Sequence, residues 1–356
     1  MPRSCSPRRA RSSLALAGLA AAALLVPSLP AGADTASTAD RAVPLTVLDV
    51  SDLETGAPPA IAWSERSSGE TVIHSADGET TTPAPKDLGL LAPMGSGYVV
   101  QAGTGSPVTR FIGADGTPGR RTWRTGYGLA VSALGEAVAF SGRAGKVWAI
   151  DSAGDRVLSF QPVPIRTKGQ AVALFGEGCK EGEGGGGCTI YVNGARGYFT
   201  SSHGIVDRAP KMRLASTGRN DLLGGITSVS DTGTCSVMLK VSRPRWRTCD
   251  NRFSDISTDD ARVIGLPAYG DGFGPTALAV LSTRDGSVEH GFRAARDGSS
   301  ATYFDEVWED AEHILVVTYQ DGKWAVVRLG VDGSMEYAVA PRKGRDVRSP
   351  FHLQTR

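Results

Sequence analysis

The residues of this chain best suited to chemistry are a group of acids. Five carboxylates lie within eight positions and a histidine follows them: Asp305, Glu306, Glu309, Asp310, Glu312 and His313. Carboxylate oxygens are the ligands that calcium prefers, so the group could hold a calcium ion. A solvated turn between two strands needs the same residue types, and this is the interpretation that we favour.

A second candidate is a dense basic and aromatic stretch, formed by Arg243, Arg245, Trp246 and Arg247. Arg and Trp are enriched at the hot spots of protein interfaces, so these residues could bind a partner. Long cationic side chains also lie over apolar surface of their own protein. Both readings stay open at this point.

Sequence signatures of catalysis are missing from the chain, which contains no G-x-S-x-G, H-E-x-x-H or C-x-x-C. The loop 269–274 is rich in glycine, but neither the Lys-Ser/Thr pair nor the helix of a phosphate-binding loop follows it. Five histidines are scattered along the chain: His74, His203, His290, His313 and His352. We predict no catalytic residue, no metal and no cofactor from these patterns.

The first 33 residues have the pattern of a secretory signal peptide. Four arginines and no acid precede an apolar run over 14–26, and Ala31-Gly32-Ala33 offers a small-residue cleavage site before Asp34. The run has 13 residues, whereas a membrane-spanning helix needs about 20. No later segment is longer. We therefore expect a secreted protein, in solution or associated with the cell wall.

Composition limits the choice of partner. Residues 34–356 carry 34 Lys and Arg against 37 Asp and Glu, with the two signs interspersed along the sequence. A nearly neutral chain gives no electrostatic reason to expect nucleic acid or an acidic membrane surface. We expect a monomer whose partner is an unknown extracellular protein or cell-wall component.

Four cysteines remain after the predicted signal peptide: Cys179, Cys188, Cys235 and Cys249. The first two flank a loop rich in glycine, and the last two are symmetric about Ser242, where we predict a hairpin turn. A cross-strand disulfide needs two residues that face each other across a hairpin. We therefore predict the pairs Cys179–Cys188 and Cys235–Cys249.

The elements that must position these residues are short strands in a repeat. An apolar strand followed by Asp-Gly or a similar pair recurs near Gly78, Gly116, Gly154, Gly204, Gly286 and Gly333. Such pairs between alternating apolar residues indicate β-hairpins. The predicted hairpin at Ser242 fills the widest gap. Seven turns then recur at a mean spacing of about 42 residues, which is typical of the four-stranded blades of a propeller.

A second kind of turn precedes each hairpin, as at 131–135 and 229–233, and no stretch shows a sustained helical period with caps. The sequence thus predicts an all-β protein, a β-propeller of about seven four-stranded blades over 57–342. An N-terminal segment, 34–56, contains an extra strand at 43–50 that could complete the last blade and close the ring. A C-terminal segment covers 343–356. Two β-sandwiches, which also use short strands, are the alternative fold.

The alternation of S-x-x-G turns with Asp-Gly turns resembles the secreted WD40-like and TolB-like β-propeller repeat proteins of actinobacteria. The resemblance covers roughly 57–342 and is clearest at 262–267 and 323–329. It implies a propeller that docks partners, and it implies no catalytic residue. We therefore expect a secreted, non-enzymatic binding or scaffolding module.

Two alternatives to a binding module remain. A propeller-fold hydrolase or lyase acting on an extracellular polymer would need carboxylates or histidines from several blades to converge at the central channel. A purely structural envelope component would show neither a pocket nor a patch. The fold alone does not choose among these functions.

Overall fold

The computed structural model describes residues 43–151, 157–177, 179, 187–270, 275–294, 301–345 and 348–356. The predicted signal peptide and residues 271–274 of the glycine-rich loop lie outside these ranges. Regular secondary structure in the described part of the chain consists of strands only. None of its segments is a helix long and apolar enough to cross a membrane.

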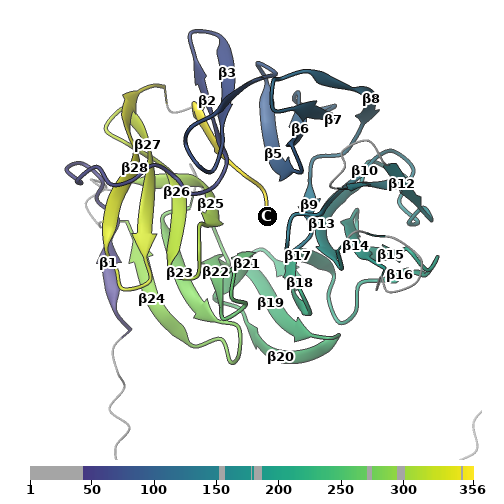
Figure 1. The fold of residues 1–356 in the computed structure, drawn as a ribbon. Coiled ribbons are helices and arrows are strands. Elements are labelled where there is room, and N and C mark those ends of the chain that lie inside the picture. Colours follow the sequence, from purple (N-terminus) through teal and green to yellow (C-terminus); the bar gives the residue numbers. More distant parts are fainter. Residues whose placement is uncertain are drawn as a thin grey trace, which may run out of the picture. The chain divides into compact units, whose positions relative to one another are not determined.

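The strands form seven sheets arranged around a central axis, each with four antiparallel strands (Figure 1). The predicted all-β propeller of seven four-stranded blades is therefore confirmed. Below, the blades are numbered 1 to 7 in chain order, and the strands of each blade are named from the innermost outward.

Blades 1 to 4 contain the following strands: in blade 1, β29 (Phe351–Leu353), β2 (Trp63–Ser67), β3 (Glu70–His74) and β4 (Thr81–Ala84); in blade 2, β5 (Leu88–Met94), β6 (Gly97–Ala102), β7 (Val108–Gly113) and β8 (Pro118–Arg124); in blade 3, β9 (Ala130–Val131), β10 (Ala137–Ser141), β11 (Val147–Asp151) and β12 (Val157–Phe160); in blade 4, β13 (Gln170–Phe175), β14 (Thr189–Asn193), β15 (Gly197–Ser201) and β16 (Val206–Arg208).

Blades 5 to 7 contain the remaining strands: in blade 5, β17 (Leu214–Arg219), β18 (Leu222–Ser230), β19 (Gly233–Lys240) and β20 (Arg243–Thr248); in blade 6, β21 (Asn251–Ile256), β22 (Arg262–Pro267), β23 (Ala277–Ser282) and β24 (Val288–Arg293), with β1 (Leu45–Val47) outside them; in blade 7, β25 (Thr302–Trp308), β26 (His313–Gln320), β27 (Lys323–Gly330) and β28 (Met335–Lys343).

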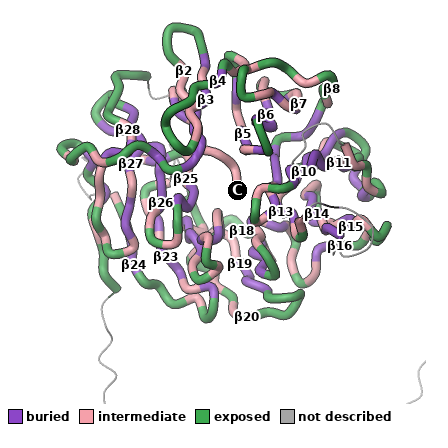
Figure 2. The backbone as a smooth tube through the Cα atoms, viewed as in Figure 1, coloured by how far each residue is buried: buried purple, intermediate pink, exposed green. Residues whose placement is uncertain are grey.

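The core of the propeller lies between neighbouring blades. Each blade packs on both faces, so its middle strands are apolar over most of their length, as in β10 and β26. The cluster between blades 6 and 7, for example, joins Ile264 and Val280 to Val316. Outermost strands such as β8 are largely exposed. Figure 2 shows this distribution, with buried residues concentrated in the middle of the blades and exposed residues at their edges.

The predicted Asp-Gly turns at Gly78, Gly116 and Gly333 each connect the third strand of a blade to the outermost strand. These glycines have positive φ angles of 71°, 81° and 91°, a conformation that L side chains rarely adopt. The predicted turn at Ser242 connects β19 to β20, and its φ is also positive. Both predicted disulfides are formed, Cys179–Cys188 and Cys235–Cys249.

The ring is closed differently from our expectation. The strand β29 pairs antiparallel with β2 and completes blade 1 from inside, whereas β1, within the segment 43–50, pairs parallel with β24 as an outer fifth strand of blade 6. The expectation that 43–50 closes the ring is therefore wrong. The innermost position of blade 1 is filled by the chain that leaves β28 and returns to the axis, where its end lies (Figure 1).

Candidate functional site

Five of the innermost strands share one irregularity, a shift of register of the β-bulge type, which lies near the first residues of four of these strands and in the second half of β21. It interrupts the pairing with the second strand in five blades: between Leu88 and Leu90, Ala171 and Ala173, Ala215 and Thr217, Phe253 and Ile256, and Tyr303 and Asp305. Bulges re-aim side chains and are common beside binding sites. All five lie toward the same end of the central channel, because residues at each of them line one cavity there.

A cavity of about 230 Å³ lies at this end of the channel. All seven blades line it, through the innermost strands or the segments next to them. Its polar lining includes Tyr127, Ser254, Asp255, Asp305 and Glu306. The residues after β29 also reach it, so the C-terminal residues form part of its wall.

Each carboxylate in the cavity wall is held by a specific donor. Asp255 accepts hydrogen bonds from the backbone N–H groups of Ile256 at 2.9 Å and Trp308 at 3.0 Å. Glu306 accepts one from the hydroxyl of Ser254 at 2.6 Å. Blades 6 and 7 thus meet at the cavity through their acids, because Asp255 lies in β21 and Glu306 in β25.

The pKa values of these acids are raised toward neutral pH. Burial raises the pKa of Asp305 to about 6 and that of Glu306 to about 7, and burial also raises the pKa of Asp255. The charges of Asp305 and Asp255 add to the rise in the pKa of Glu306, because like charges disfavour one another. The charge of the cavity therefore varies with pH in the physiological range.

No ion pair joins Asp255, Asp305 or Glu306 to a cation within the described ranges. Arg356 also lines the cavity, and its charge lowers the pKa of Asp255, but its guanidinium donates to the backbone carbonyl of Glu309 at 3.0 Å and forms no ion pair with the three acids. Carboxylates in a concave site whose pKa values are strongly raised by burial and by neighbouring charge, as that of Glu306 is, are a recognised signature of a functional site. The cavity is thus our candidate site.

An aromatic ring stands at the rim of the cavity. Tyr127 is 52% exposed, and its hydroxyl donates to the backbone carbonyl of Gly89 at 3.2 Å. Burial raises the pKa of Tyr127, and the charge of Asp305 raises it further. The ring and a carboxylate therefore lie near each other, and aromatic rings and carboxylates both attract cations.

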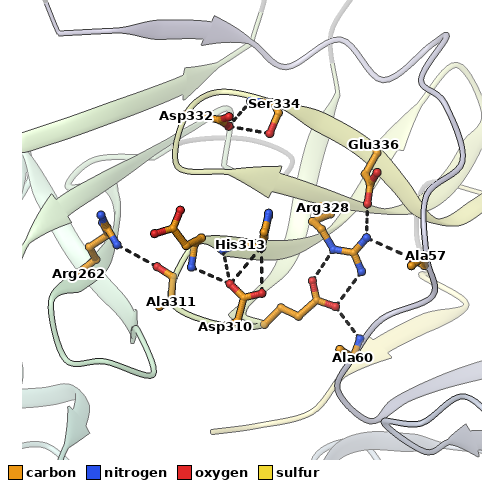
Figure 3. A network of polar contacts seen from close by, with 12 residues as sticks. Ala57, Ala60, Arg262, Asp310, Ala311, His313, Arg328, Asp332, Ser334 and Glu336 are labelled. Atoms are coloured by element: carbon orange, nitrogen blue, oxygen red, sulfur yellow. Dashed lines mark hydrogen bonds and ion pairs between the residues drawn. The ribbon is translucent and has the colours of Figure 1, made fainter.

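The predicted acidic cluster is divided among three environments. Asp305 and Glu306 line the cavity, and Glu309 forms an ion pair with Arg328. Asp310 binds the ring of His313 at 2.9 Å (Figure 3). In the described part of the chain, no three His, Cys, Asp or Glu side chains are arranged to hold a metal ion. The calcium interpretation of this cluster has no support in the geometry.

The predicted partner-binding residues lie far from the cavity, on the outermost strand of blade 5. Arg243, Arg245 and Arg247 are exposed. Trp246 is half-buried, because its ring packs edge-on against Phe253 and its indole N–H donates to the carbonyl of Thr283. The tryptophan therefore joins blades 5 and 6, while partner binding by the three arginines stays a prediction.

Sequence reasoning missed Tyr127, Ser254 and Asp255 as site residues. One signal was present: an aromatic residue, any residue and then Asp occur at the bulge in both β21 and β25, ending at Asp255 and Asp305. An acid within a predicted inner strand, at the same position of two repeats, is unusual. The position of Tyr127, in the segment before a two-residue strand, has no comparable signal.

No family model matches the chain, and no curated protein sequence matches it. Solved β-propellers are distantly similar to it in structure. They include TolB from Acinetobacter baumannii (12% identity, 78% of this chain, 66% of that chain, TM-score 0.41) and BamB from Moraxella catarrhalis (12% identity, 82% and 80%, TM-score 0.40). An uncharacterized protein from Listeria monocytogenes, lmo1340, is similar at 11% identity over 83% of this chain and 97% of that chain (TM-score 0.45). The chain thus spans just under two thirds of TolB, and it has no family assignment.

Proposed function

We propose that the protein is a non-enzymatic binding propeller of the extracellular space, and that its channel cavity takes a small cationic group of a ligand or partner. One observation carries this proposal. Asp255, Asp305, Glu306 and the ring of Tyr127 surround a single cavity, and none of the three acids has an ion-pair partner among the described residues.

The size of the cavity favours a small group. Pockets for drug-sized ligands have volumes of roughly 300–1,000 Å³, and the cavity has about 230 Å³. This volume is about that of eight water molecules, at roughly 30 Å³ each. An alkylamine or one lysine side chain fits this volume. A partner protein would therefore insert one side chain and use the surrounding face for its other contacts.

The electrostatics favour a cation. A bound ammonium stabilises the ionised form of each acid, so its arrival lowers the pKa values of Asp305 and Glu306 and releases protons. The ring of Tyr127 adds a cation–π attraction of about 1 kcal/mol at a partly exposed site. A neutral group of equal size would leave Asp255 and Glu306 with only the more distant charges of arginines such as Arg356 and Arg252, which form no ion pair with them among the described residues.

The second candidate is a hydrolase or lyase that acts on an extracellular polymer. It is favoured by Glu306, whose pKa of about 7 suits a general acid. The volume of the cavity disfavours it, because a polymer needs a longer groove across the reacting bond. Turnover of a polysaccharide or peptide polymer that Glu306→Gln abolishes would support this candidate.

Calorimetric titration with 1,5-diaminopentane tests the binding function, with 1,5-pentanediol as the uncharged control. We expect the diamine to bind near pH 8 and the diol not to bind, and Asp305→Asn and Glu306→Gln each to weaken binding about tenfold. Glu70→Gln is the matched control, because Glu70 is exposed on β3. Equal binding of diamine and diol, or unchanged affinity in both site variants, would show that the cavity is not a cation site.

A further inference from the structure

A groove of about 700 Å³ lies between blades 4 and 5. It is bounded by the turn between β14 and β15, the connection from β16 to β17, and β18. Because β13 and β17 begin at the cavity end of the channel, β14 and β16 end there. The groove and the cavity therefore open on the same face of the propeller.

Four cations line the groove: Arg196, Arg208, Lys211 and Arg213. All four are exposed, and within the described ranges none of them forms an ion pair. Like charges around one concavity repel each other, and a concave surface concentrates their field. An anion in the groove would relieve this repulsion.

The groove belongs to a basic part of the ring. Residues 88–248, which form blades 2 to 5, carry 19 Lys and Arg against 10 Asp and Glu. The rest of 34–356 carries 15 Lys and Arg against 27 Asp and Glu. The two signs, although mixed locally, are thus unevenly divided along the sequence, and the same imbalance appears in space because each of these blades is built from a contiguous stretch of chain.

We propose that this groove binds a linear anionic polysaccharide, at a site separate from the cation cavity. Arginine forks match carboxylate and sulfate oxygens, so each cation can bind one anionic group of the polymer. The described residues between the cations are mainly small, namely Ala195, Gly197 and Ala209.

Two other classes of macromolecule fit the groove less well. Single-stranded nucleic acid binds on aromatic platforms, and no aromatic side chain is among the described residues of the lining. Hot spots for protein partners combine arginine with tryptophan or tyrosine, but the described lining of the groove has no aromatic side chain, and Met212 is half-buried against the core between blades 4 and 5. A polysaccharide that carries repeated anionic groups and no apolar anchors matches this surface best.

The test is calorimetric titration of the folded protein with oligogalacturonate, with neutral dextran as control ligand. The groove variant replaces all four cations by Gln: Arg196→Gln, Arg208→Gln, Lys211→Gln and Arg213→Gln. The matched control replaces three exposed arginines on the outer edge of blade 2: Arg120→Gln, Arg121→Gln and Arg124→Gln. Thermal unfolding checks that both variants are folded, and Arg208→Gln with Arg213→Gln serves as a milder groove variant.

We expect oligogalacturonate to bind, more weakly as salt is raised, and the groove variant to lose at least about tenfold in affinity. The control variant should keep the affinity of the unmodified protein, and dextran should not bind. Equal losses of affinity in both variants would show that binding depends only on the net charge of the protein, and this would overturn the proposal. Tighter binding of polyglutamate or of single-stranded DNA through the same four residues would show that the occupant belongs to another class.

Discussion

The carboxylate of Asp305 in β25 accepts a hydrogen bond from the backbone N–H of Leu353 in β29, at 2.9 Å. A residue of the candidate site therefore also holds the strand that closes the ring. Asparagine keeps an acceptor oxygen at this position, whereas alanine leaves a buried N–H without a partner.

Replacement of Asp305 should separate these two roles. We expect Asp305→Ala to lower the free energy of unfolding by about 1–3 kcal/mol, the usual cost of an unsatisfied buried donor. Asp305→Asn should be less destabilising than Asp305→Ala at pH 5, and it should still weaken cation binding. Urea unfolding of the two variants measures the difference, and equal stabilities would mean that the bond to Leu353 contributes nothing.

Asp305 and Glu306 should each contribute a loss of stability as pH rises from about 4 to about 7, whereas His352, whose pKa burial lowers to about 4, contributes a gain of stability over much of this interval. The folded-state pKa values of Asp305 and Glu306, about 6 and about 7, lie above the ordinary values of 3.8 and 4.5 for these side chains. Between these limits each of the two acids binds more protons in the folded state than in the unfolded state, so at these two groups a rise in pH favours unfolding. The loss is complete once pH exceeds the folded-state pKa.

Glu306→Gln should remove part of this pH dependence, because glutamine does not titrate. We expect the variant to gain about 3 kcal/mol relative to the parent protein between pH 4 and pH 8, with the usual pKa conversion. Urea unfolding at several pH values measures the slope, and Glu70→Gln is the control. An unchanged slope in Glu306→Gln would contradict the raised pKa.

Because β29 closes the ring and β1 does not, substitutions in these two terminal strands should differ in their effect on stability. Phe351 is buried in the core between blades 7 and 1, whereas Leu45 in β1 is 49% exposed. We expect Phe351→Ala to lower the free energy of unfolding by about 3–5 kcal/mol, and Leu45→Ala to change it by about 0.5 kcal/mol or less. Thermal and urea unfolding test this, and the reverse order would assign ring closure to β1.

The ion pair of Arg328 and Glu309 should matter for stability rather than for binding. Nε and Nη2 of Arg328 lie 2.5 Å and 2.9 Å from the two oxygens of Glu309, and Glu309 also accepts from the backbone of Ala60 (Figure 3). Arg328 donates in addition to Glu336 and to the carbonyls of Ala57 and Pro58. The pair therefore fastens the chain that leads into blade 1 onto blade 7.

We expect Arg328→Met to destabilise the protein by about 3–5 kcal/mol, because it leaves the buried carboxylate of Glu309 uncompensated. Adding Glu309→Met should recover part of the loss. Diamine affinity at the cavity should stay unchanged in both variants. A loss below about 1 kcal/mol in the single variant would mean that solvent or another cation compensates Glu309.

The sequence by itself determined the features that depend on near neighbours. The turns at Gly78 and Ser242 follow from residues within a few positions, and Cys235–Cys249 joins residues only 14 apart across one hairpin. The repeat of about 42 residues also predicts the number of blades, because each blade is built mainly from one contiguous stretch of chain. These features can be predicted without knowing which residues pack against them.

The site and the ring closure were decided by the tertiary structure. The pairing of Trp63 with Leu353 and the meeting of Asp255 with Glu306 join residues that lie far apart in the sequence, and no local pattern encodes such contacts. Asp305 and Glu309 look alike in the sequence, yet one faces a cavity and the other a buried arginine. Their difference arises because the bulge in β25 and the packing of blade 7 set the direction of each side chain, and with it the solvent and charges that the side chain meets.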